Sequence, residues 1–197
     1  MEKQELLDCV KERILADDLP LKKSATNLVF GKGNPDAEIM LVAEAPGAQE
    51  DLQGIPFVGK AGKELDKLLH LIGLSLDDVY IANILKYRPP KNRDPNPEEI
   101  RTHTPFLIEQ IKIIQPKILV TLGNYATKFV LADFVPENMK SISGIMQLHG
   151  VPMQKTIDGL SFTVVPLYHP AAVIYRREWY KDLENDFLKL REILKNK

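Results

Sequence analysis

Short, mainly apolar runs recur four times along the chain, each four or five residues long and followed by charged or turn-forming residues. They occupy positions 39–42, 79–82, 118–122 and 162–165. Apolar runs of this length are typical of strands that are buried on both faces of a parallel sheet. The pattern therefore predicts a central, mainly parallel sheet of four strands.

Stretches with helical spacing separate these runs. Leucines repeat at helical intervals over 61–71, and Asn96-Pro97-Glu98-Glu99 supplies the N-cap, first-turn proline and acidic residues that begin a helix reaching about residue 114. Further helices are expected at 2–15 and 181–194. The stretch 133–150 is expected to be a loop, alternatively a loop that carries a short helix, and 148–156 to be an edge strand. Alternating strands and helices indicate the α/β class, with a three-layer α/β/α arrangement.

The composition fits one compact domain covering residues 1–197. The chain is 44% hydrophobic and 27% charged, and no linker-like or low-complexity segment divides it. No apolar run approaches the length of a membrane span, and the charged amino terminus lacks a signal-peptide core. The single cysteine, Cys9, excludes an internal disulfide and agrees with a reducing compartment. We therefore expect a cytoplasmic protein.

Three candidate reactive residues fall where predicted strands end. Glu44, Asn83 and His169 are far apart in the sequence, yet each lies at or just after the carboxyl end of an apolar run. In open parallel sheets these ends meet at one edge, where ligands bind. Each residue alone has an ordinary structural explanation, as a turn cap, a backbone-bonded amide or a loop histidine. Their joint placement predicts a site.

Basic residues gather beside the same loops. The net charge of −1 gives no overall attraction to nucleic acid, so any contact with DNA requires a local basic face. Such clusters are most often solvated surface charges. The candidates for this face are Lys60, Lys63, Lys86, Arg88, Lys91, Arg93, Arg176 and Arg177.

Motifs distributed over nearly the whole chain carry a family resemblance. They are Glu44-Ala45-Pro46-Gly47, Glu50-Asp51, Pro56-Phe57-Val58-Gly59, Ala61-Gly62, Tyr80-Ile81-Ala82-Asn83, Lys86, Arg88-Pro89-Pro90, Asn92-Arg93-Asp94-Pro95, Leu122-Gly123 and Tyr168-His169-Pro170. In order and spacing this set resembles the family 4 uracil-DNA glycosylases. The resemblance implies hydrolysis of the N-glycosidic bond of a uracil flipped out of DNA, leaving an abasic site. No lysine stands at a matched site position, so lyase chemistry is not expected.

The resemblance also implies how the base is recognised. Asn83 would accept a hydrogen bond from uracil N3–H and donate one to O4, a pattern that cytosine cannot satisfy. Phe57 would stack on the base. Glu50 would lie beside C5, where bulk excludes the methyl group of thymine. Backbone N–H groups around Ala43 and Ala45 would join His169 in donating toward uracil O2.

Catalysis and DNA contact follow from the same resemblance. His169 would stabilise the charge on departing uracil. Glu44 would position water or stabilise the positively charged sugar, and the sequence does not decide between these two roles. Lys86 and Arg88 would contact DNA. The segment 169–176 would press into the duplex where the base has left, through Pro170, Ala171 and Arg176.

Two departures from the family pattern stand out. Family 4 enzymes hold a [4Fe–4S] cluster with four cysteines, and the matching positions here are Ala16, Leu19, Tyr87 and His103. Cys9 falls outside that pattern. We therefore predict no cluster, no other metal and no small cofactor, with side chains such as Leu19 and Tyr87 filling the space. In addition, Ala43 replaces a glycine, and its methyl group is expected to crowd the base near O2.

The predicted partner is uracil-containing DNA, single- or double-stranded, bound by a monomer that has no membrane segment. Two alternatives remain open from the sequence. One is a DNA-binding module of the same fold that has lost turnover. The other is a glycosylase with different base specificity, for example for hypoxanthine or G·T mispairs.

Overall fold

A six-stranded sheet forms the centre of the structure. The structure is a computed structural model that describes residues 2–195, except for the side chains of residues 175 and 177. The strands are β1 (Lys32–Gly33), β2 (Ile39–Ala43), β3 (Val79–Asn83), β4 (Ile118–Leu122), β5 (Met153–Ile157) and β6 (Leu160–Leu167). Their order is β1-β3-β2-β4-β6-β5, and only the two outer strands run antiparallel to their neighbours. The four predicted strands are confirmed as the parallel centre of the sheet.

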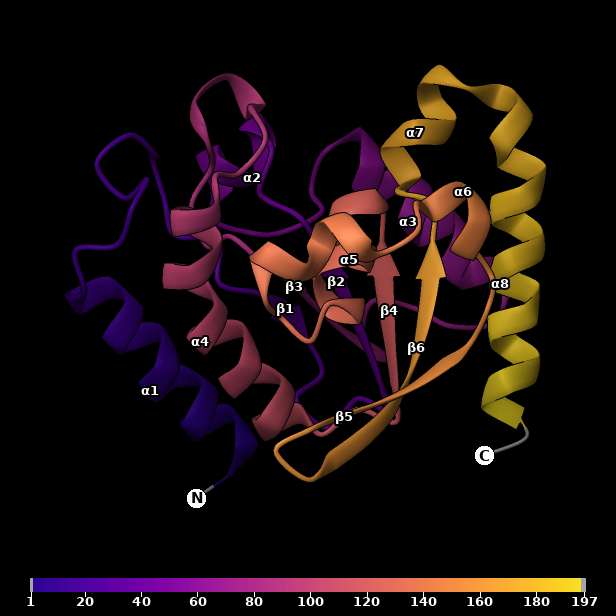
Figure 1. Cartoon of the computed structure of the whole chain (residues 1–197), viewed down its shortest axis with the longest axis horizontal. Coiled ribbons are helices and arrows are strands. Elements are labelled where there is room, and N and C mark those ends of the chain that lie inside the picture. Colours follow the sequence, from indigo (N-terminus) through magenta and orange to yellow (C-terminus); the bar gives the residue numbers. More distant parts are fainter. Residues whose placement is uncertain (1, 196–197) are drawn as a thin grey trace.

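Helices cover both faces of this sheet, which confirms the three-layer prediction (Figure 1). The longer helices are α1 (Lys3–Ala16), α3 (Lys60–Leu71), α4 (Pro97–Ile114), α5 (Asn124–Leu131) and α8 (Tyr180–Lys195). The shorter ones are α2 (Ala48–Gln53), α6 (Ile145–Leu148), α7 (Pro170–Tyr175) and the 3-10 turns η1 (Pro90–Asn92), η2 (Pro136–Ser141) and η3 (Arg177–Trp179). None of the helices described over 2–195 has the length and apolarity needed to cross a membrane.

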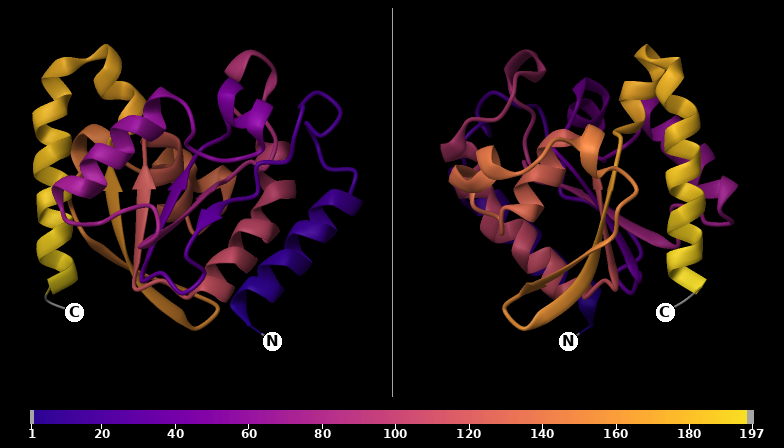
Figure 2. Two further views of the ribbon diagram at one scale, coloured as in Figure 1. Left: turned by 180° about the vertical axis from the view of Figure 1, so that it is seen from behind. Right: turned by 45° about the vertical axis from the view of Figure 1, so that its right-hand side comes forward.

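Alternate residues of the strands face two separate core clusters. In β2, Met40 and Val42 pack with α1, α4 and α5, while Ile39 and Leu41 pack with α3 and α8. The two views of Figure 2 show these helix layers on opposite sides of the sheet. Burial on both faces explains why these strands are apolar throughout rather than alternating.

The register of the parallel strands brings their carboxyl ends level. Ala43, the last residue of β2, is paired with Asn83, the last residue of β3, and Leu122 of β4 is paired with Leu167 of β6. Glu44 therefore follows β2 directly, and His169 comes two residues after β6. The loops that lead into α2 and α7 lie at this same edge (Figure 1).

Candidate active site

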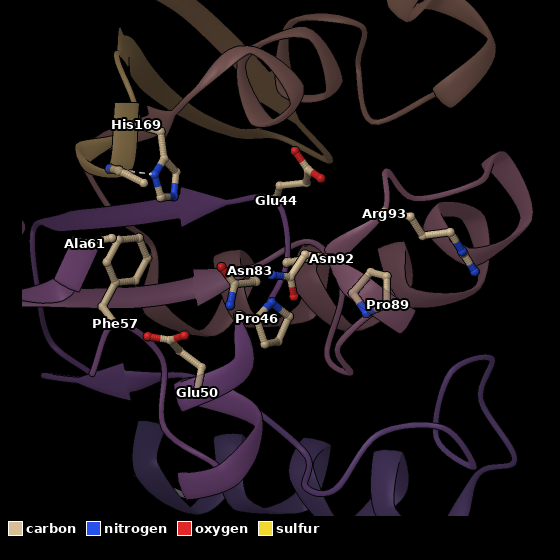
Figure 3. Close-up of a pocket in the computed structure, with 13 residues that line it drawn as sticks. Glu44, Pro46, Glu50, Phe57, Ala61, Asn83, Pro89, Asn92, Arg93 and His169 are labelled. Carbon is tan, nitrogen blue, oxygen red and sulfur yellow. Dashed lines mark hydrogen bonds between the residues drawn. The ribbon is translucent and has the colours of Figure 1, made fainter. Parts of the chain in front are cut away.

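A pocket of about 350 Å³ opens at the carboxyl edge of the parallel strands, which is the usual ligand position in such sheets (Figure 3). Its wall combines three loops and the end of β3. The lining residues are Glu44, Ala45, Pro46, Gly47, Glu50, Phe57, Ala61, Asn83, Pro89, Asn92, Arg93, His169 and Ala171. Glu44, Asn83 and His169, which the sequence placed at one edge, thus line one cavity.

Asn83 presents a buried hydrogen-bond acceptor to this cavity. The residue is only 2% exposed, and its side-chain Oδ1 has no hydrogen-bond partner among the described residues. Leaving a buried polar atom unpaired costs about 1–3 kcal/mol, and of the unpaired buried side-chain atoms among the described residues only Asn83 Oδ1 belongs to a residue that lines this pocket. The geometry suits a planar ligand that brings its own N–H donor.

Phe57 lies beside His169 in the wall of the pocket. Its backbone has a φ of 52°, a left-handed conformation that a phenylalanine seldom adopts. The turn is held in place by Glu50, whose Oε1 accepts hydrogen bonds from the N–H groups of Val58 (3.0 Å) and Gly59 (2.9 Å). The Phe57 and His169 rings are 5.7 Å apart at an interplanar angle of 25°. The turn therefore presents an aromatic face to any ligand in the pocket.

Gly62 allows this turn to approach α3. A Cβ atom at Gly62 would lie 2.0 Å from the carbonyl oxygen of Phe57. We expect Gly62→Ala to displace the Phe57 turn and to lower the free energy of unfolding by about 1–3 kcal/mol, as overpacking usually does. Thermal unfolding measures the loss. Gly144→Ala is the matched control, since its new methyl group meets no backbone atom within 4 Å, only the side-chain oxygens of Gln147 (3.2 Å) and Asn124 (3.5 Å). Equal unfolding temperatures for the two variants would contradict the prediction.

His169 is a neutral hydrogen-bond donor. Burial lowers its pKa to about 4, although the charge of Glu50 opposes that shift. Its Nδ1 accepts the N–H of Ala171 (3.1 Å), and this bond caps α7. A neutral imidazole with an accepting Nδ1 carries its proton on Nε2. The ring is thereby fixed with its N–H available to a ligand in the pocket (Figure 3).

Glu44 is half-buried in the lining of the same pocket. Burial raises the pKa of its carboxyl group to about 7, and the nearby negative charge of Asp94 raises it further in the same direction. A carboxyl group with this pKa changes its charge close to neutral pH. It is therefore poised for proton transfer or for charge stabilisation within the pocket.

Three of the residues predicted to contact substrate or DNA are placed elsewhere. Lys86 is wrong as a phosphate contact, because its side chain is fully buried. Pro170 is buried in the first turn of α7 and is not an exposed wedge. Ala43 is 1% exposed and its side chain packs in the core cluster with α3 and α8, outside the pocket wall. The expected crowding of a base by its methyl group is therefore wrong.

The remaining DNA-contact candidates stay accessible. Arg88 is partly exposed, and its Nε donates to Oδ1 of Asn92 (2.7 Å). Arg176 is exposed and lies over the Trp179 ring, 4.6 Å from its centroid. Of these three residues, Ala171 lines the pocket, and the two arginines have side chains accessible to solvent.

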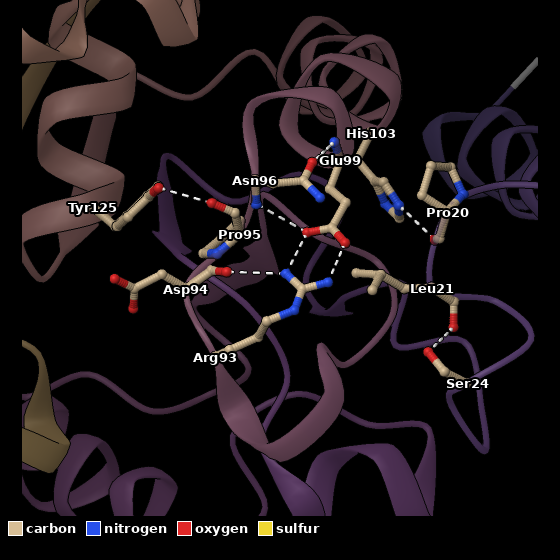
Figure 4. A network of polar contacts seen from close by, with 10 residues as sticks. All are labelled: Pro20, Leu21, Ser24, Arg93, Asp94, Pro95, Asn96, Glu99, His103 and Tyr125. Carbon is tan, nitrogen blue, oxygen red and sulfur yellow. Dashed lines mark hydrogen bonds and ion pairs between the residues drawn. The ribbon is translucent and has the colours of Figure 1, made fainter.

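One wall that the sequence did not assign comes from the loop after β3. Pro89, Asn92 and Arg93 line the pocket. Arg93 forms a double contact with Glu99 (2.8 and 2.5 Å) and also donates to the carbonyl of Asp94, while Asn96 caps α4 (Figure 4). The motif at 92–95 drew attention to this loop, but only the tertiary contact with α4 shows that it forms a fixed wall.

Comparison with known proteins agrees with this geometry. Residues 30–195 match the uracil DNA glycosylase superfamily. The chain is 43% identical to a type-4 uracil-DNA glycosylase of Archaeoglobus fulgidus over 96% of its own length and 94% of the relative's. It is 44% identical to the type-4 enzyme of Sulfurisphaera tokodaii, covering 95% and 84% of the two chains, and 41% identical to that of Thermotoga maritima, covering 89% and 86%. The chain therefore belongs to the uracil DNA glycosylase superfamily.

Proposed function

We propose that this chain is a type-4 uracil-DNA glycosylase that hydrolyses the N-glycosidic bond of a flipped-out deoxyuridine and leaves an abasic site. The observation that carries the proposal is the buried, unpaired Oδ1 of Asn83, set in a pocket that also offers an aromatic face and a neutral N–H donor. Uracil brings the N3–H that this oxygen lacks. The type-4 names of the relatives point the same way.

Base recognition is divided among four residues in this proposal. The Asn83 carboxamide pairs with N3–H and O4 of uracil, and Phe57 stacks on the ring. Glu50 holds the turn that carries Phe57 and supplies the bulk near C5 that excludes thymine. The backbone N–H of Ala45 joins the donors on the O2 side. Thymine and cytosine are rejected by size and by polarity, respectively.

Bond cleavage separates charge across the pocket. As the bond from C1′ to N1 breaks, its electron pair passes to uracil and leaves a cationic sugar, which water attacks. The Nε2–H of His169 donates to uracil O2, where the negative charge accumulates. The Glu44 carboxylate stabilises the cationic sugar and accepts the proton of the attacking water, so it works in its ionised form.

The pH dependence tests this role of Glu44. Because its pKa is about 7, the carboxyl group is protonated at lower pH, and we expect the rate of uracil release to rise with pH through about 7 and then level off. Asp94→Asn removes a charge that raises this pKa and should shift the midpoint to lower pH. Glu44→Gln should lower the plateau by about 10²-fold and flatten the profile. A wild-type rate that falls as pH rises through 7 would contradict the assignment.

We propose that catalysis proceeds without an iron–sulfur cluster or other cofactor. Among residues 2–195, no group of three or more His, Cys, Asp and Glu side chains is arranged to hold a metal ion. The residues at the four cluster positions also do not fit one. Ala16 and Leu19 have no ligand atom, and Tyr87 offers a phenol where a cluster needs a thiolate. Both ring nitrogens of His103 are engaged, Nδ1 by the N–H of Lys86 (3.0 Å) and Nε2 by the carbonyl of Pro20 (3.1 Å). The pKa of His103 is lowered to about 4, chiefly by burial. The ring is therefore neutral at neutral pH, and Nδ1 remains an acceptor for the N–H of Lys86.

The partner in this proposal is uracil-containing DNA, single- or double-stranded. Arg88 and Arg176 contact its phosphates, and Ala171 lines the pocket that the base enters. We further propose that the chain works as a monomeric, cytoplasmic enzyme in which residues 1–197 form one domain.

Release of uracil from an oligonucleotide with a single deoxyuridine tests the function. After incubation with metal-free protein, alkali should cleave the strand at that position, and strands with thymidine, deoxycytidine or deoxyinosine there should stay intact. Binding without release would instead identify an inactive DNA-binding module. Faster release from the deoxyinosine strand would identify a different base specificity.

A further inference from the structure

Lys86, one of the largest fully buried side chains among the described residues, is hydrogen-bonded to the backbone of Asn83. Its Nζ donates to the backbone carbonyl oxygen of Asn83 at 2.8 Å and to Oε1 of Gln110 at 2.5 Å. Both partners are neutral, and within the described chain no carboxylate forms an ion pair with this ammonium. Burial accordingly lowers the pKa of Lys86 to about 7. Because removing an ammonium group from water costs free energy, we expect Lys86 to have a role that compensates for its burial.

Lys86 is fixed at every polar atom that it has. Its backbone N–H donates to His103 Nδ1, and its carbonyl accepts the N–H of Val29 (2.9 Å). Gln110 is oriented in turn, because its Nε2 donates to the carbonyl of Phe30 (3.0 Å) and to the Tyr80 hydroxyl (3.4 Å). The lysine tip is therefore a rigid anchor on the core side of the pocket wall.

That anchor holds the part of β3 that turns into the site. Beyond Asn83 the chain leaves the strand, with the N–H groups of Ile84 and Leu85 bonded to the carbonyls of Ala43 and Glu44. The Asn83 carbonyl points the other way and is bound by Lys86. Fixing this peptide group fixes the direction in which the Asn83 side chain leaves the backbone.

Building on the proposed function, we propose that Lys86 is a positioning residue for uracil recognition, which holds the Asn83 backbone so that the carboxamide meets the flipped base. Lys86 touches neither base nor DNA, and it acts only through Asn83. A displacement of about 1 Å at a recognition group can cost on the order of 10²-fold in rate, so even a partial loss of this anchor should be measurable.

A double-mutant cycle tests this role. Lys86→Met keeps the length and apolar stem of the side chain but removes the donor, and we expect uracil release to fall about 10-fold. In an Asn83→Ala background, the same substitution should lower release less than about 2-fold, because there is no carboxamide left to position. Single-turnover assays with excess enzyme give the four rates of the cycle. They are run well below the unfolding temperature of each of the four enzymes.

Thr121→Val is the matched control. Thr121 is also buried, on β4, which β2 separates from the strand of Asn83. Its hydroxyl bonds to Thr127 (2.9 Å), so the loss of this hydroxyl weakens the core without touching Asn83. Equal losses from Lys86→Met in both backgrounds, or a loss no greater than that of Thr121→Val, would overturn the proposal. A wild type that releases no uracil would overturn the proposed function and this inference with it. Should Lys86→Met not fold, Gln110→Met removes the second anchor of the ammonium and is expected to show the same dependence on Asn83 at about 3-fold.

Discussion

Replacement of Asn83 by alanine is expected to reduce uracil release by about 10³-fold, because the base loses both hydrogen bonds that distinguish it from cytosine. The Oδ1 of Asn83 is buried and unpaired at the pocket wall. An alanine at this position has no atom that could accept the N3–H of the base in its place. Most of the effect should appear in the rate of bond cleavage rather than in DNA binding, because Asn83 contacts the base only after it has flipped into the pocket. Single-turnover cleavage of the deoxyuridine oligonucleotide measures it.

Asn92→Ala is the control for this substitution. Asn92 also lines the pocket and carries the same amide, but it is exposed and its Oδ1 is bonded to Arg88. We expect its rate to stay within about 3-fold of the wild type, as for most exposed positions. A loss for Asn92→Ala that matches the loss for Asn83→Ala would show that the pocket reads the base from a different wall.

Replacement of His169 by alanine is expected to cost about 10²- to 10³-fold, which is the usual effect of removing one donor to a developing anion. The imidazole is neutral because burial lowers its pKa to about 4, so its contribution should be constant from about pH 5 upward. The rising limb near pH 7 is then due to Glu44, and it should persist in the His169→Ala enzyme at the lower rate.

His70→Ala supplies the comparison, because His70 is exposed on α3 and lies outside the pocket lining. Its rate should match the wild type. A His169→Ala enzyme that retains more than a tenth of wild-type activity would show that other donors carry the leaving-group charge. In that case the N–H of Ala45 is the first to test.

The central strands of the sheet were predictable because a strand that is buried on both faces is a continuous apolar run in the sequence. The run at 118–122, for example, coincides with β4. The outer strands leave a weaker record. β1 has only two residues, and β5 alternates between exposed and half-buried positions, so the segment at 148–156 was placed several residues early. Neither strand has the continuous apolar pattern on which the prediction depended.

Within the site, chain position was predictable and side-chain environment was not. Glu44, Asn83 and His169 reach one pocket because parallel strands end together. Lys86 looked like a DNA contact because a lysine in a basic loop is usually exposed. Its burial is decided by Gln110, 24 positions later on α4, and no local pattern reports that contact. The pKa of Glu44 likewise depends on Asp94, which only the folded loop brings near.

The unpaired oxygen of Asn83 also affects how this protein would respond to directed evolution. The free protein carries the cost of a buried acceptor, and a bound base relieves that cost. A screen that rewards heat resistance alone would favour apolar side chains of similar size at this position, since they remove that cost. Thermostable variants obtained in this way would tend to lose their activity, unless each round also selects for base release.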